Sequence, residues 1–228
     1  MFLEPSPPPR PWRRSAFQVA ALMFATFGLY AFVWAFCVRR ACATILERED
    51  QPIWKTIALV VPIFNFFLMF DLGKRIEGVT WRADPSRSEE YLPWVGLSMF
   101  AFNVIGRLNT GYSFLSVLGF VPISTMQRSL SRAQIALLGD EALPTRLHWA
   151  EWIFLVLGVV YWIFVGLGVT LGSDIPHDYI PWFYGSLALA VVLLVLIWNF
   201  SRRAIAEGLA MHAAAAATTV PVQPSSSV

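Results

Sequence analysis

Stretches of twenty or more residues without a charged side chain limit the possible folds of this chain more than any other feature. The most apolar of them cover residues 15–38, 152–171 and 179–201. A helix needs roughly 20 apolar residues to cross the hydrocarbon core of a bilayer. Several of these runs also lack the polar stripe that a helix on a soluble protein carries. The sequence therefore predicts an all-α membrane helix bundle.

The composition supports the same class of protein. Hydrophobic residues make up 57% of the chain and charged residues only 14%, whereas soluble domains average about 45–50% and about 25%. The net charge is +2, and the basic residues lie beside apolar runs rather than in one clustered basic surface, which a nucleic-acid partner would need. We expect the lipid bilayer to be the main partner, with other membrane proteins or a second copy of the chain as further partners and no nucleic acid.

The membrane domain is expected to cover residues 15–205. Before it, a proline-rich basic arm (residues 1–14) is predicted to be disordered, and after it residues 206–228 form a low-complexity tail with little to bury. We predict about six membrane segments, near residues 15–38, 56–70, 91–106, 112–127, 152–171 and 179–201.

The second segment is the least regular. Residues 56–70 would extend only about 22 Å as a helix, which is less than the roughly 30 Å of a hydrocarbon core. Pro62 removes a backbone donor in the middle of this segment, so we expect a kink there. The segment either crosses the membrane as a short bent helix or re-enters and leaves on the same side.

Lysine and arginine residues indicate the orientation. With six spans and a cytoplasmic N-terminus, 12 of the 17 basic residues lie inside; with a re-entrant second segment and an external N-terminus, 13 do. Both arrangements satisfy the positive-inside rule and place the C-terminus in the cytoplasm. We favour six spans because the loop at 39–55 also carries Glu47, Glu49 and Asp50. The expected location is the plasma (inner) membrane, as a multi-pass protein.

Two further patterns predict local structure. Residues 128–138 alternate basic or polar side chains with leucine, isoleucine and alanine, which is typical of an amphipathic helix on the membrane surface. Gly168 and Gly172 have the spacing that allows two membrane helices to pack closely.

No motif assigns a catalytic residue, a metal ligand or a cofactor-binding residue, so none is predicted. His148 and Glu151 lie three residues apart on one helical face, which suits an interfacial pair that could act in acid–base chemistry. Asn65, Asn103 and Asn199 are the polar residues that lie nearest to membrane depth. Intramembrane polar residues suggest a functional site, although asparagine also joins helices by hydrogen bonds.

Three functions follow in order of preference. The first is a non-enzymatic membrane protein that acts as a scaffold, a sensor or an interaction partner in the membrane. The second is a small transporter or channel subunit with a polar site near Pro62 and Asn65. The third is a membrane enzyme that uses His148 and Glu151.

Two short motifs carry a resemblance to a known kind of protein. The first is Thr26-Phe-Gly-Leu-Tyr30 followed by Trp34, and the second is Val61-Pro-Ile-Phe-Asn65 followed by residues 71–76. This pattern resembles an uncharacterised (domain of unknown function) family of small bacterial multi-span membrane proteins. The resemblance covers the N-terminal third of the chain. It implies a bacterial inner-membrane location and no particular reaction.

Overall fold

The protein is described by a computed structural model that covers residues 12–26, 28–59, 61–87, 89–106, 111–143, 146–147, 149–171 and 179–218. Every regular element within these ranges is a helix, which confirms the all-α prediction. The elements are α1 (Ala16–Ala25), α2 (Tyr30–Leu46), α3 (Pro52–Ala58), α4 (Pro62–Ala83), α5 (Leu92–Ile105), the 3₁₀ helix η1 (Gly111–Gly119), α6 (Phe120–Leu138), the 3₁₀ helix η2 (Gly139–Ala142), α7 (Trp149–Leu171) and α8 (Tyr179–Thr218).

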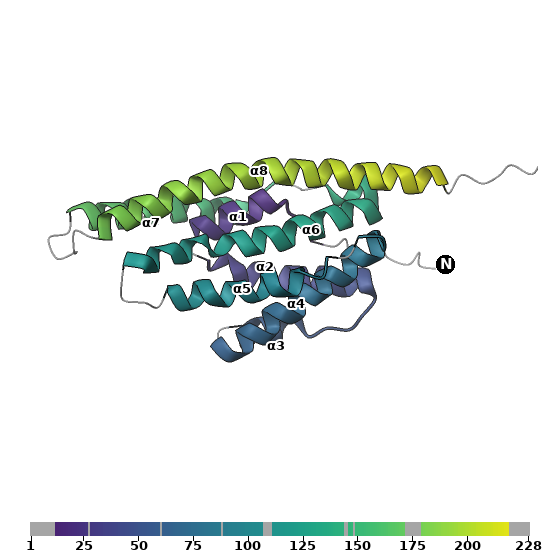
Figure 1. The fold of residues 1–228 in the computed structure, drawn as a ribbon, viewed down its shortest axis with the longest axis horizontal. Coiled ribbons are helices and arrows are strands. Elements are labelled where there is room, and N and C mark those ends of the chain that lie inside the picture. The colour runs from purple at the N-terminus through teal and green to yellow at the C-terminus, as the bar shows by residue number, and fades with distance from the viewer. Residues whose placement is uncertain are drawn as a thin grey trace, which may run out of the picture.

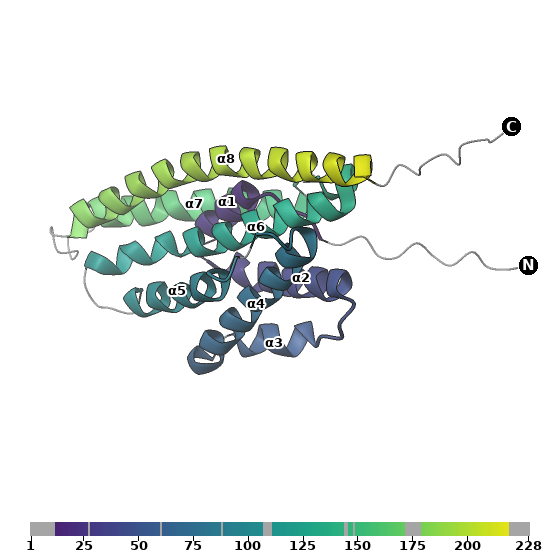
Figure 2. The same cartoon turned by 45° about the vertical axis from the view of Figure 1, so that its right-hand side comes forward.

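The helices run roughly along one direction and form successive hairpins (Figures 1 and 2). The pairs are α1 with α2, α3 with α4, α5 with η1 and α6, and α7 with α8. In both views α7 and α8 form one layer, α1 and α6 lie beneath it, and the α3–α4 hairpin lies on the far side of the bundle. The long connections between hairpins therefore gather at one end of the molecule.

Two helices, α7 and α8, are long and apolar enough to cross a membrane by length and composition. Most of their large apolar side chains point outward, among them Ile153, Phe164 and Val192. An exposed apolar helix surface of this length is expected where hydrocarbon surrounds the protein.

The first predicted segment is not one straight helix. α1 ends at Ala25 and α2 begins at Tyr30, and between them the chain reverses at Gly28, whose φ is +85°. Glycine adopts this left-handed conformation without a steric penalty. With ten residues, α1 extends only about 15 Å. Residues 15–38 therefore form a short hairpin.

The second predicted segment is also divided. α3 ends at Ala58, the chain turns near Leu59, and α4 begins at Pro62. The expected kink at Pro62 is therefore wrong: proline occupies the first turn of a new helix, where its missing N–H costs no hydrogen bond. Residues 56–70 fold as a helix–turn–helix.

Helix α6 lies at the centre of the bundle and carries six of the twelve buried polar or charged side chains among the described residues. The Trp34 indole N–H donates to Gln127 Oε1 at 2.8 Å, and Gln127 Nε2 donates to the Arg14 carbonyl at 2.7 Å. The segment 128–138 was expected on the membrane surface, but Ser131 and Gln134 are buried and bonded inside the protein. These two polar side chains bond the segment before α1 rather than facing water, so the expectation of a surface helix was wrong.

The described parts of the predicted arm and tail, residues 12–14 and 206–218, are more ordered than the sequence indicated, whereas residues 1–11 and 219–228 lie outside the described residues. In the predicted arm, the carbonyls of Trp12 and Arg14 accept hydrogen bonds from α6 side chains. In the predicted tail, α8 continues to Thr218, and the His212 ring lies 3.1 Å from the Ala136 carbonyl. Alanine is the strongest helix former, so the alanine run extends the helix.

Close helix contacts occur at glycines other than the predicted ones. A Cβ on Gly158 would lie 2.1 Å from the Ala25 carbonyl oxygen, and one on Gly96 would lie 2.4 Å from that of Met69. At Gly168 nothing lies within 4 Å, while Gly172 falls outside the described residues. The tight helix–helix contact of α7 is therefore at Gly158.

Candidate functional site

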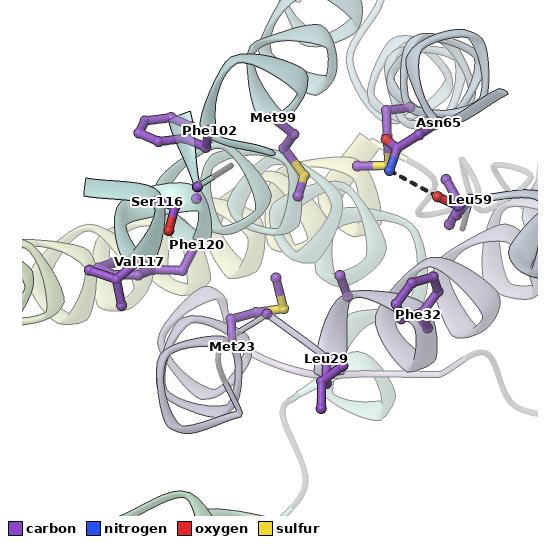
Figure 3. Close-up of a pocket in the computed structure, with 15 residues that line it drawn as sticks. Met23, Leu29, Phe32, Leu59, Asn65, Met99, Phe102, Ser116, Val117 and Phe120 are labelled. Carbon is purple, nitrogen blue, oxygen red and sulfur yellow. Dashed lines mark hydrogen bonds between the residues drawn. The ribbon is translucent and has the colours of Figure 1, made fainter. Parts of the chain in front are cut away.

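A cavity of about 390 Å³ lies where the tips of three hairpins meet. Met23 and Phe32 come from the α1–α2 hairpin, Leu59 from the α3–α4 hairpin, and Met99 and Phe120 from the α5–α6 hairpin (Figure 3). Ligand cavities of about 300–1,000 Å³ are typically apolar with a few polar groups. The volume and the lining of this cavity fit an apolar ligand.

Asn65 is the sequence-predicted residue that this cavity includes. Its Nδ2 donates to the Leu59 carbonyl at 3.0 Å and so fastens the turn between α3 and α4. Its Oδ1 is buried and has no hydrogen-bond partner among the described residues. The amide therefore has a structural role through its nitrogen, while its buried oxygen lacks a hydrogen-bond partner among the described residues.

A second space, a groove of about 490 Å³, lies on the other side of the α1–α2 turn. It runs between that turn and α7, and its lining includes Val33, Leu157 and Tyr161. Leu29 lines both spaces and is 70% exposed. The α1–α2 turn thus separates two half-open spaces, here called the inner cavity and the apolar groove.

Beside the inner cavity lies a group of five charged residues, here called the ion cluster: Arg39, Asp50, Lys55, Asp71 and Arg75. Arg39 is fully buried, and its Nη1 lies 2.9 Å from Asp71 Oδ2 and 3.7 Å from Asp50 Oδ2. Its Nη2 donates to the Leu68 carbonyl at 2.9 Å. The cluster joins the end of α2, the following loop, α3 and α4.

Asp50 is the inner carboxylate of the ion cluster. Its Oδ1 lies 2.5 Å from Lys55 Nζ and 3.4 Å from Arg75 Nη2. Burial alone would raise the pKa of Asp50, but the Lys55 hydrogen bond and the charges of Arg75 and Arg39 outweigh it, so the pKa lies below its ordinary value. Asp50 is therefore held as an anion, and it neutralises basic residues on α2, α3 and α4.

Glu151 has partners that sequence spacing did not indicate. Its carboxylate accepts from Arg14 Nε at 3.0 Å and Nη2 at 2.8 Å, and from the Tyr30 hydroxyl at 3.0 Å. These bonds tie the start of α7 to the segment before α1 and to the start of α2. Its predicted neighbour His148 lies outside the described residues.

The remaining predicted polar residues are dispersed. Asn199 is exposed on α8 and is not part of the described cavity lining. Asn103 lies on α5, and its side chain is outside the described set. In the described part of the chain, no group of three or more His, Cys, Asp or Glu side chains could hold a metal ion. Cys37 and Cys42 are both free thiols.

A third charged group holds the extension of α8. Arg132 is buried on α6 and pairs with Glu89, which is also buried, and its Nη1 lies 3.5 Å from Glu207 Oε2 on α8. Arg87 also pairs with Glu207, at 3.6 Å. These contacts bring the α4–α5 connection, α6 and the end of α8 together at one end of the bundle.

Sequence analysis missed these charged groups because their members are far apart in the chain. The one local signal was Asp71 and Arg75, whose i,i+4 spacing predicts an ion pair on one helix face; their side chains do pair, at 3.2 Å. No local pattern links Arg39 or Asp50 to them, since those contacts require the hairpins to be folded.

Comparisons with protein-family models, with curated proteins and with solved structures find no match to this chain. The resemblance of its N-terminal third to an uncharacterised bacterial membrane family remains a prediction.

Proposed function

We propose that the chain is an integral membrane protein whose four hairpins all enter the bilayer from one side. The α7–α8 hairpin spans it, as the length and apolar surface of these helices support. The short α1–α2 and α3–α4 hairpins would penetrate only part of its depth. Arg82 on α4 contacts Glu47 and the Ile45 carbonyl and so joins the ends of α2 and α4. This contact supports entry of both hairpins from the same side of the membrane.

The distribution of basic residues supports this topology over the two topologies predicted from the sequence, six full spans or a re-entrant second segment. In the hairpin arrangement, most of the 17 Lys and Arg residues lie by chain position nearer to the end where the hairpins begin and finish than to the hairpin tips. Arg107, between α5 and η1, lies at a tip by chain position. By the positive-inside rule this end is cytoplasmic, together with the C-terminus. The proposed location is the bacterial inner membrane.

Cysteine labelling tests the topology. In a variant in which Cys37 and Cys42 are replaced by alanine, we expect Arg48→Cys and Arg87→Cys to react with an impermeant maleimide from the same side of the membrane. Both positions are exposed. Ala214→Cys on exposed α8 serves as the reference for that side. Reaction of Arg48→Cys from the opposite side only would support a crossing second segment instead.

We propose further that the protein works as a lipid-binding scaffold and holds an apolar chain from the bilayer in its inner cavity. The observation that carries this proposal is a cavity of about 390 Å³ between hairpin tips, lined mostly by apolar side chains. A cavity of this kind, surrounded by lipid, is most readily filled by a lipid chain. Binding of this kind needs no reactive group.

A cavity-filling substitution tests the binding role. Ala31 lines the cavity, and Ala31→Phe is expected to lower the affinity for a long-chain lipid by about tenfold or more, the factor that about 1.4 kcal/mol produces. The measurement is native mass spectrometry of lipid retained by the detergent-purified protein. Ala188→Phe makes the same change on the exposed face of α8 and should leave retention unchanged.

Two outcomes would contradict the lipid-binding role. One is equal lipid retention by Ala31→Phe and Ala188→Phe. The other is small-solute flux through reconstituted vesicles well above that of empty vesicles, lost in Asn65→Ala, which would instead support a transporter with its polar site at Asn65.

A further inference from the structure

The ion cluster lies along the same helix faces as the inner cavity. Lys55 on α3 precedes the cavity residue Leu59, the C-cap of that helix, by four positions, which places both on one face about 6 Å apart along the axis. On α2, Arg39 follows the cavity residue Phe32 by seven positions, again on one face and about 10 Å further along. The two basic side chains therefore follow the cavity toward the end of the bundle where the hairpins begin.

The cluster carries an excess of positive charge. Three cations, Arg39, Lys55 and Arg75, face two carboxylates, Asp50 and Asp71. Arg39 and Asp50 are closed off, with 0% and 1% of their side chains exposed, whereas Lys55 is 35% and Arg75 18% exposed. A further anion would therefore meet Lys55 and Arg75 first.

Asp71 is 43% exposed, but Arg39 and Arg75 both contact its Oδ2. An approaching anion therefore meets a carboxylate that is paired with two guanidinium groups, both of which also lie near Asp50. With three cations and two carboxylates, the ion cluster can bind one more negative charge and become neutral overall.

The surroundings of Lys55 suit the headgroup level of a bilayer. Ile53, Trp54 and Ile57, on the same short helix, are all more than half exposed. Tryptophan prefers the membrane–water interface, and lysine extends from an apolar stem toward headgroups. Basic pockets at the cytoplasmic side of membrane helices bind anionic headgroups.

We infer that the ligand of the inner cavity is an anionic phospholipid whose phosphate binds Lys55 and Arg75 while one acyl chain fills the cavity. This inference rests on the lipid-binding role proposed above and adds the headgroup class. The separation along the helices between Lys55 and the cavity lining matches the distance from a lipid phosphate to the start of its chain.

The test compares two lipids with identical chains, phosphatidylglycerol and phosphatidylcholine, by native mass spectrometry of the full chain. The wild type is expected to retain phosphatidylglycerol preferentially. Lys55→Gln should reduce that preference about fivefold, the effect of one basic residue at the membrane surface. Lys55→Arg should restore it. Lys74→Gln is the matched control, since Lys74 is an exposed cation on α4 that lies 5.2 Å over the Phe70 ring and outside the cluster.

The outcomes separate this inference from the lipid-binding role. If Lys55→Gln and Lys74→Gln change the preference equally, headgroup recognition at the cluster is wrong, whereas loss of both lipids in Ala31→Phe still supports the cavity. If inorganic phosphate alone displaces the lipid from the wild type, the cluster is a simple anion site and the inference is overturned. If the wild type retains neither lipid, the lipid-binding role itself fails. A melting curve for each variant shows whether it is folded.

Discussion

Replacing Arg39 with methionine is expected to lower the apparent melting temperature of the purified protein by roughly 6–12 °C. The side chain is fully buried and bonds both Asp71 and the Leu68 carbonyl. Loss of one partner from a buried ion group costs about 3 kcal/mol, and 1 kcal/mol corresponds to about 2–4 °C in a chain of this length. The measurement is thermal unfolding in detergent.

Arg40 provides the control, since it is the next residue of α2 and is exposed. Arg40→Met should change stability by no more than about 0.5 kcal/mol, and equal losses in the two variants would show that burial of the cluster is unimportant. Because the folded-state pKa of Asp50 is lowered, its contribution is complete above the ordinary value of about 3.9 and disappears as the pH falls through the folded-state value. The difference between wild type and Arg39→Met should therefore narrow below about pH 4.

The second large effect is expected from Gly158→Ala, which should destabilise the protein by about 1–3 kcal/mol. The added methyl group would lie 2.1 Å from the Ala25 carbonyl oxygen and 2.6 Å from its carbon. Both are backbone atoms, so α1 and α7 must separate to make room for it. That separation would also disturb the Arg14–Glu151 pair at the start of α7.

Gly168→Ala on the same helix makes the identical change in open space. It should be neutral or stabilise the protein by up to about 1 kcal/mol, because alanine favours a helix more than glycine does. Thermal unfolding of the two variants side by side checks both. A greater loss in Gly168→Ala would show that α7 packs through its Gly168 end, as the glycine spacing predicted.

The features that sequence predicted well depend on long local patterns. The uncharged runs at 152–171 and 179–201 correspond to α7 and α8, because a helix that faces lipid must be apolar over its whole length. The sequence also showed Asn65 as an isolated polar group in an apolar stretch, and that residue does line the cavity.

The features that sequence missed depend on contacts between distant segments. Nothing local distinguishes a span from two short helices joined by a turn, so the break at Gly28 was not seen. Pro62 has two opposite consequences in a helix, a kink in the interior or a favourable start, and the choice depends on where the chain turns. The spacing of the polar residues in 128–138 is the same for a helix on a membrane surface and for one inside the bundle. In the folded protein, α8 and the segment at Trp12 cover these residues, and the local sequence does not show that contact.

The contact between Arg14 and Glu151 has a consequence for the order of assembly during synthesis. The two residues are 137 positions apart, and ribosomes add about 5–20 residues per second, so roughly 7–27 s pass before the acidic partner is made. Through that interval the Arg14 guanidinium and the Tyr30 hydroxyl lack the Glu151 carboxylate that they contact in the folded protein. Nascent chains truncated before α7 should thus hold an incomplete N-terminal half, open to insertases or quality-control proteases.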